Sequence, residues 1–219
     1  MNVSHPSTET DISSERGPRA RTRKLMVKTA SRLMQAGLTP SVSEVAEAAE
    51  VSRATAYRYF PSEVALVHAV VDEALGPILK WKGKSQNAEE RVLDLFEKSL
   101  PRIAEFEATF KAALRLSLDQ WARGQGGTLG EEPRFTRGHR MDLLCDALSP
   151  LRGTLPEGDF DRLAQALSLI FGIEVYTVLK DIWGLPATQS SEVAKWAACA
   201  LVRTAVAEAQ TRREAKTNT

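Results

Sequence analysis

The chain has 219 residues, of which 43% are hydrophobic and 26% are charged, so it can bury a substantial core in one compact unit or in two unequal domains. The formal net charge is only +1, but residues 16–60 hold nine Lys or Arg against three Glu, an excess of six positive charges that leaves −5 for the rest. A basic segment on a slightly acidic body is typical of a protein that binds nucleic acid at one end.

Residues 1–18 are polar and rich in Ser and Thr, and we expect a disordered N-terminal tail. They contain no apolar run that would serve as a signal sequence or membrane anchor, so a membrane partner is not expected. Basic residues follow at Arg16, Arg19, Arg21, Arg23 and Lys24. They form either an arm that follows a nucleic-acid backbone or enters a minor groove, or a solubilising terminus.

Residues 41–60 predict two short helices joined by a tight turn. Ser41 and Glu44 have the spacing of a capping box, which fixes the start of the first helix. An apolar stripe follows at helical spacing, formed by Val42, Val45, Ala46 and Ala49. Val51 is expected to fill the turn, and Ser52 is a suitable N-cap for a second helix from Arg53.

The second helix has two distinct faces. Ala56 and Phe60 share one side, whereas Ala54, Thr55 and Arg58 lie opposite, flanked by two tyrosines. The pattern predicts a helix-turn-helix that reads DNA in the major groove, with Arg58 suited to guanine and the small side chains to thymine methyls. The tyrosine and serine hydroxyls suit phosphates. The candidate DNA-binding residues are Ser41, Ser43, Ser52, Arg53, Ala54, Thr55, Tyr57, Arg58 and Tyr59. The alternative is an ordinary helical hairpin with a polar surface.

These residues make the chain resemble the tetracycline-repressor (TetR) family of bacterial transcription regulators. The similar segments are Val45-Ala46-Glu47-Ala48-Ala49, residues 51–60, Pro61-Ser62 and Ala65-Leu66, and the resemblance is close over residues 20–80. It implies an all-α fold, in which a three-helix helix-turn-helix DNA-binding domain precedes a larger helical ligand-binding and dimerisation domain. It also implies a small-molecule effector and favours a repressor over an activator.

Two positions depart from the family pattern. The turn usually carries Gly where this chain has Glu50, so we expect the backbone there to avoid the left-handed conformation that Gly favours. The next helix usually begins with a phosphate-contacting Lys near position 63, and this chain has Glu63. A carboxylate repels phosphate, so we expect that contact to be lost.

The sequence after residue 61 predicts helices throughout. A helix starts after Ser62 and ends near Gly76-Pro77. Further amphipathic segments cover 88–104 and 106–122, a glycine-rich loop covers 124–133, and another helix spans 135–148. Cys145 and Cys199 lie in apolar helical contexts, which is typical of reduced, buried thiols in a cytoplasmic protein.

The last two predicted helices, 163–183 and 191–209, indicate a subunit interface. The first is apolar in nearly every direction, with a break at Glu174, so it needs cover on two sides. Pairing of both helices with a second copy predicts a homodimer; a monomer with a deep core is the alternative. A dimer would place two reading helices on successive major grooves of an inverted-repeat operator.

Candidate ligand-binding residues are the large side chains expected inside the body. Each of them is better explained as ordinary core than as a ligand contact, because aromatic residues at helical spacing occur in any core. Glu174 differs, because a carboxylate in apolar surroundings needs a partner, across the dimer or on a ligand, unless it is partly exposed. The set is Phe106, Phe110, Leu114, Trp121, Met141, Phe171, Glu174 and Tyr176.

No enzyme is expected, and no cofactor or metal site. His5, His68 and His139 are far apart in sequence, and metal-site spacings and nucleophile motifs are lacking. The alternative function is a helical small-molecule-binding or adaptor protein that no longer reads DNA. The expected domains are a tail at 1–18, the helix-turn-helix domain at 19–65, the ligand-binding and dimerisation domain at 66–211, and a disordered tail at 212–219.

Overall fold

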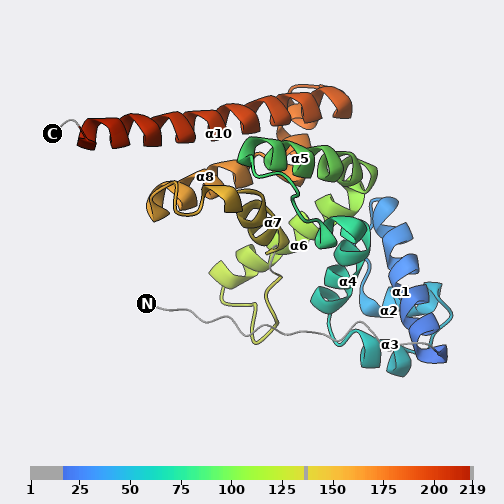
Figure 1. Cartoon of the computed structure of the whole chain (residues 1–219). Coiled ribbons are helices and arrows are strands. Elements are labelled where there is room, and N and C mark those ends of the chain that lie inside the picture. Colours follow the sequence, from blue (N-terminus) through green and yellow to red (C-terminus); the bar gives the residue numbers. More distant parts are fainter. Residues whose placement is uncertain (1–16, 136–137, 218–219) are drawn as a thin grey trace.

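The computed structural model describes residues 17–135 and 138–217, and these contain helices and connecting segments without a strand (Figure 1). The expected all-α fold is therefore confirmed, while residues 1–16, with Arg16 and His5, lie outside the described residues. The elements in chain order are α1 (Pro18–Gln35), α2 (Val42–Ala48), α3 (Arg53–Tyr59), α4 (Glu63–Leu75), the 3-10 turn η1 (Gly76–Lys80), α5 (Ala88–Glu105), α6 (Glu107–Gln125), α7 (His139–Ala147), the 3-10 turn η2 (Ser149–Leu151), α8 (Glu157–Leu169), α9 (Ile173–Tyr176), the π-turn η3 (Thr177–Ile182) and α10 (Ala187–Thr217).

Helices α1 to α4 gather at one end of the molecule around their own apolar core (Figure 1). Met26 and Met34 of α1, Val45 of α2 and Phe60 after α3 are almost completely buried in it. The same core also takes in residues of α6 and the buried Phe135. The N-terminal helices therefore pack firmly onto the body.

The body consists of α5 to α10. Its core is centred on α5, where Leu95, Phe96 and Leu100 are fully buried. The long α10 crosses one side of the molecule and packs on α5 and α8 (Figure 1). This arrangement leaves α4 between the N-terminal helices and the body, in contact with both α1 and α5.

The predicted helix over 163–183 is wrong as a single element. Helix α8 ends at Leu169, and the following helical segment is bent from it by 51°. The break contains Gly172, whose φ of +130° suits glycine, and a Cβ there would stand 2.6 Å from an Arg140 guanidinium nitrogen. The bend therefore depends on a residue that has no side chain.

Two helix boundaries also differ from the prediction. Helix α7 begins at His139, four residues after the expected start at Phe135, whose backbone N–H instead donates to Gln120 on α6. Helix α10 continues to Thr217, into the segment expected as a disordered tail from 212. Arg213 holds this end of α10 to the body by donating to the carbonyls of Gly153 and Thr154.

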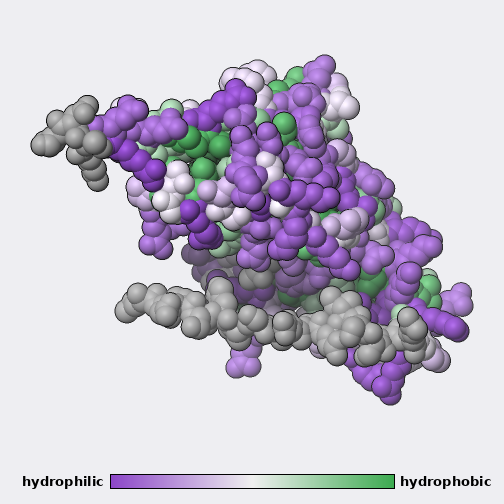
Figure 2. Space-filling model, in the orientation of Figure 1, coloured by the Kyte–Doolittle hydropathy of each residue, from purple (hydrophilic) through white to green (hydrophobic). Residues whose placement is uncertain are grey.

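Hydrophilic residues cover most of the face shown in Figure 2, and an apolar patch is visible between α10 and α8. In the described part of the chain, no single helix has the length and apolarity to cross a bilayer; only α8 taken with α9–η3, across their bend, passes that test. Cys145 and Cys199 are free thiols and only partly buried.

Candidate nucleic-acid interface and adjoining pocket

The start of α2 is fixed by the predicted capping box. The Glu44 backbone N–H donates to Ser41 Oγ at 3.2 Å, and the Ser41 N–H donates to Glu44 Oε2 at 2.7 Å. The Ser41 backbone N–H and, less strongly, its hydroxyl lower the pKa of the Glu44 carboxyl, because they favour its charged form. Helix α2 thus begins where the sequence predicts.

The turn after α2 corrects the expectation for Glu50. Its φ is +53°, so a non-glycine residue does adopt the left-handed conformation, and the expectation that it would not was wrong. Two backbone bonds hold the turn: the Val51 N–H donates to the Ala46 carbonyl at 2.9 Å, and the Glu50 N–H donates to the Glu47 carbonyl at 3.1 Å. This is the Schellman arrangement, and it overcomes a steric cost of roughly 1–2 kcal/mol for an L-residue.

Helix α3 has one buried and one exposed face, as predicted. Ala56 and Phe60 are 0% and 2% exposed, and they anchor the helix to α1 and α2. The Ser52 hydroxyl accepts the Thr55 N–H at 3.3 Å and donates to Thr55 Oγ1 at 2.9 Å, which caps the helix. The opposite face is therefore free to meet another molecule.

The predicted DNA-binding side chains come together on this outer side. Arg53, Ala54, Tyr57 and Arg58 are exposed. The Arg58 guanidinium lies 5.6 Å from the centre of the Tyr59 ring. Ser41, Ser43, Thr55 and Tyr59 are partly buried, and Ser52 is exposed. A hydrogen bond of 3.2 Å between Ser43 Oγ and the Tyr57 hydroxyl joins α2 to α3.

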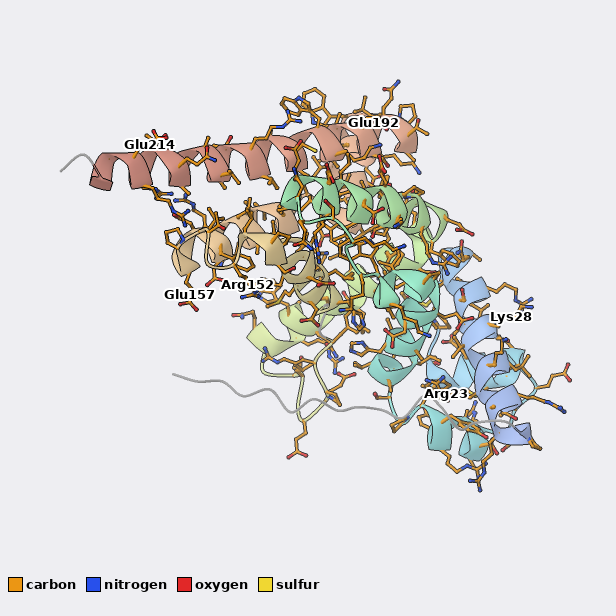
Figure 3. All side chains as sticks on the ribbon, in the orientation of Figure 1. Arg23, Lys28, Arg152, Glu157, Glu192 and Glu214 are labelled. Carbon is orange, nitrogen blue, oxygen red and sulfur yellow. The ribbon has the colours of Figure 1, made fainter. Side chains whose placement is uncertain are left out.

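Basic residues of α1 extend this surface. Arg19, Arg21, Lys24, Lys28 and Arg32 are exposed, and no acidic residue of the described chain pairs with them. Lys28 points away from α1 in Figure 3, while Arg23 lies on the side of Phe60, with its guanidinium 5.6 Å from that ring. This end of the molecule therefore carries the positive charge that the sequence predicts.

Glu63 lies in the first turn of α4, beside this surface. Ser62 caps the helix by accepting the Ala65 N–H at 3.2 Å. Burial raises the pKa of the half-buried Glu63 carboxyl, and the nearby carboxylates of Glu132, Asp119 and Glu44 raise it further. A negative group thus stands where the resemblance would put a lysine.

A pocket of about 80 Å³ lies between α4 and the body. Its walls come from α4, η1, α5, α6, α7 and the bend at Gly172. Most of the lining is apolar, including Val71, Ile103 and Leu143. The pocket therefore contacts α4, the helix that directly follows α3.

Only some of the predicted ligand-binding residues line this pocket. Phe110 and Phe171 line the pocket, whereas Phe106 and Leu114 are partly buried outside its lining. Tyr176 is fully buried, and its hydroxyl donates to the Leu100 carbonyl at 2.7 Å.

The other three predicted residues are also outside the lining. Trp121 and Met141 are 66% and 67% exposed on the surface. Glu174 has the partner that its surroundings require, because Arg140 donates to Glu174 Oε2 at 2.7 Å. Arg140 itself lines the pocket and also donates to the Ser168 carbonyl at 3.0 Å.

Polar pocket residues that the sequence reasoning missed are His68, Ser99, His139 and Arg140. Ser99 and His68 interrupt the apolar stripes of their helices, and that interruption was the available signal. The two histidines, 71 positions apart in sequence, meet at this one pocket. No sequence spacing indicates that meeting, because it depends on how α7 packs against α4.

His139 joins α7 to α4. Its Nε2 lies 2.9 Å from Asp72 Oδ1, and this hydrogen bond raises the pKa of the His139 imidazole. Burial instead lowers the pKa of the His68 imidazole, with a further lowering from His139 that the Asp72 carboxylate opposes. In the described residues, no group of three or more His, Cys, Asp or Glu side chains could hold a metal ion.

Comparison with known proteins agrees with this geometry. Residues 27–70 match the family described as bacterial regulatory proteins, tetR family. The crystal structure of a tetR-family transcriptional regulator from Streptomyces coelicolor is similar, with a TM-score of 0.62 and 18% identity over 86% of this chain and 83% of that one. The crystal structure of a TetR transcriptional regulator from Rhodococcus sp. RHA1 is also similar, with a TM-score of 0.53 and 16% identity over 85% of this chain and 97% of that one. A search of curated proteins finds no match. The N-terminal helices therefore contain the segment that matches the tetR family, and the described chain shares the fold of these two regulators.

Proposed function

We propose that the chain is a homodimeric repressor that binds an inverted-repeat operator and is released from it by a small molecule. In this proposal residues 19–65 form the DNA-binding domain and residues 66–211 the ligand-binding and dimerisation domain. The family resemblance favours repression. The observation that carries the proposal is the position of α4, which packs in the core of the N-terminal helices and also forms a wall of the pocket.

DNA reading is assigned to the exposed face of α3. Arg58 has the fork geometry for the O6 and N7 atoms of guanine, and Ala54 and the Thr55 methyl suit thymine methyls. Arg53, the Tyr57 and Tyr59 hydroxyls, and the serines Ser41, Ser43 and Ser52 are assigned to phosphates, which position the helix. The unpaired basic residues of α1 add attraction that does not depend on sequence.

Dimerisation is assigned to α9, η3 and α10. Ile182, Trp183 and Trp196 are 74%, 72% and 74% exposed, and Val178 and Val193 are also exposed. Helical spacing puts Val178 beside Ile182, and Val193 beside Trp196. These side chains belong to two elements that contact each other, η3 and α10, and exposed large apolar side chains are typical of a protein interface. The resemblance to the family makes a second copy the partner.

Release follows from differential binding. A ligand regulates only if it binds the conformation without DNA more tightly than the DNA-bound conformation. The side chains of His68, Val71 and Leu75 project from α4 into the pocket lining. A molecule that displaces these side chains would shift α4, which packs in the same core as α3, the helix assigned to DNA reading.

The test is selection of the purified full chain on a random duplex library at about 150 mM salt, which suppresses purely electrostatic binding. We expect an inverted repeat with half-sites about one helical turn, or about 34 Å, apart. Half-sites without a symmetric partner would overturn the dimer. Failure of a folded protein to enrich any sequence would favour the alternative, a helical small-molecule-binding or adaptor protein.

A further inference from the structure

The pocket contains a buried hydroxyl without a partner. Ser99 of α5 is 0% exposed and lines the cavity, and its Oγ has no hydrogen-bond partner in the described structure. Helical hydroxyls elsewhere in the chain, such as those of Thr177 and Ser190, donate to the carbonyl four residues earlier. Ser99 does not, so its hydroxyl is left unsatisfied at the wall of the pocket, and a ligand that bonded to it would relieve its desolvation cost.

His68 of α4 supplies a second available group. Its ring centre lies 4.4 Å from that of Phe135, and no described residue hydrogen-bonds to it. Because burial lowers its pKa, the imidazole is neutral near pH 7 and has one donor and one acceptor nitrogen. Both Ser99 and His68 can thus bond to an uncharged oxygen.

The charged residues of the lining already have opposite charges beside them. His139 lies 2.9 Å from Asp72, and Arg140 lies 2.7 Å from Glu174. An ionised ligand would enter apolar surroundings and lose its hydration without gaining an unpaired counter-charge. The pocket therefore disfavours anions and cations alike.

The volume limits the size of the occupant. A cavity of about 80 Å³ has room for more than one water molecule, so a small organic molecule can enter it. A single substituted ring is of this size.

We propose that the effector is a compact, uncharged, mainly apolar molecule with a hydroxyl or carbonyl oxygen that hydrogen-bonds to Ser99 and His68. This inference rests on the proposed small-molecule regulation and names the chemical class of the ligand. Ser99 belongs to α5 in the body, and His68 belongs to α4. A molecule bonded to both would therefore tie the reader to the body in one relative position.

The experiment measures binding of four ring compounds to the full chain without DNA, by calorimetry or ligand-detected NMR. Phenol carries a neutral hydroxyl, toluene is its apolar counterpart, benzoate is an anion and benzylammonium is a cation. We expect phenol to bind the unaltered chain about tenfold more tightly than toluene, the usual worth of a well-placed hydrogen bond. Benzoate and benzylammonium should bind no more tightly than toluene.

Variants locate the effect. Ser99→Ala and His68→Phe should each weaken phenol binding several-fold and leave toluene binding unchanged. The matched control is Thr109→Val, because the Thr109 hydroxyl is also fully buried and unpartnered but lies outside the pocket lining. It should change neither affinity. Circular dichroism checks that every variant is folded.

The contrary results are distinct. Four results would each overturn the proposal. They are tighter binding of benzoate or benzylammonium than of phenol, equal binding of phenol and toluene, phenol binding that survives both pocket substitutions, and no phenol binding at about 10 mM, tenfold above a weak Kd of about 1 mM. None of these results affects the library selection, which tests DNA binding by α3. If the selection fails, the order of the four affinities still tests the proposed ligand class.

Discussion

Glu63→Lys should strengthen operator binding. Two effects on stability oppose each other, since a lysine at the start of α4 opposes the helix dipole at a cost of about 0.3–1 kcal/mol. The second effect is stabilising, because the substitution removes a carboxylate that Glu132, Asp119 and Glu44 repel. This repulsion adds to burial in raising the pKa of the Glu63 carboxyl. The free energy of unfolding should therefore change by less than about 1 kcal/mol.

The effect on DNA binding should be larger. One new lysine–phosphate contact per subunit releases about 0.9 counterion, so two contacts steepen the slope of log K against log salt by about 1.8. With equal affinities at about 1 M salt, this slope gives about 30-fold tighter binding at about 150 mM. Glu63→Gln removes the carboxylate without adding a contact, so it should tighten binding less and leave the slope unchanged.

Fluorescence anisotropy on the selected repeat, over a series of salt concentrations, measures both quantities. Glu73→Lys is the control, because it makes the same charge change on an exposed position of α4, ten residues or about 15 Å further along the helix. Equal slopes for the two lysine variants, or weaker binding by a folded Glu63→Lys protein, would refute the assignment of this helix start to the DNA backbone.

Other substitutions test other parts of the structure. Glu50→Gly should raise the free energy of unfolding in urea by about 0.5–1 kcal/mol, because glycine adopts the left-handed turn without steric cost; a loss would mean that the turn is unstrained. His139→Gln should cost at most about 1 kcal/mol below pH 6.5, and this cost should vanish as pH rises through the raised folded-state pKa, since only protonated His139 forms the ion pair; a cost that is constant from pH 5.5 to 8.5 would contradict this. Trp196→Glu should produce monomers in sedimentation velocity, whereas Leu118→Glu, at another exposed apolar position, should leave dimers; dimers in both would move the interface elsewhere. Arg58→Ala should lose about 1–3 kcal/mol of operator binding and relax preference at one base position, and unchanged affinity would remove Arg58 from the reader.

The sequence predicts those features of this fold that neighbouring residues determine. The caps at Ser41 and Ser52 are local hydrogen bonds, and both are confirmed. The helix start after Ser62 and the two faces of α3, which follow from local spacing, are confirmed as well. The left-handed Glu50 was missed because backbone bonds to α2 override its residue preference. Gly172 was missed because a single glycine within an apolar run does not by itself end a helix.

The pocket was harder to predict than the reader. Its polar groups come from helices that are distant in sequence, and whether a histidine or a serine finds a partner depends on tertiary packing. Phe110 and Phe171 could be found as large apolar residues, but so could Trp121, which lies on the surface. Apolar spacing identifies candidate core positions without distinguishing a cavity wall from a filled interior or an uncovered face.

Helix α4 has the geometry of a lever. Its 13 residues give a rigid rod about 20 Å long, with the pocket contacts from His68 to Leu75 toward one end and the reader at the other. A tilt of only about 5° about the pocket end carries the other end through about 1.7 Å, since displacement grows with arm length. In a dimer the two displacements act in opposite directions across the twofold axis. In the proposed dimer, a ligand in this pocket would therefore change the spacing between the two copies of α3 by several ångströms, without any change within the N-terminal helices of either subunit.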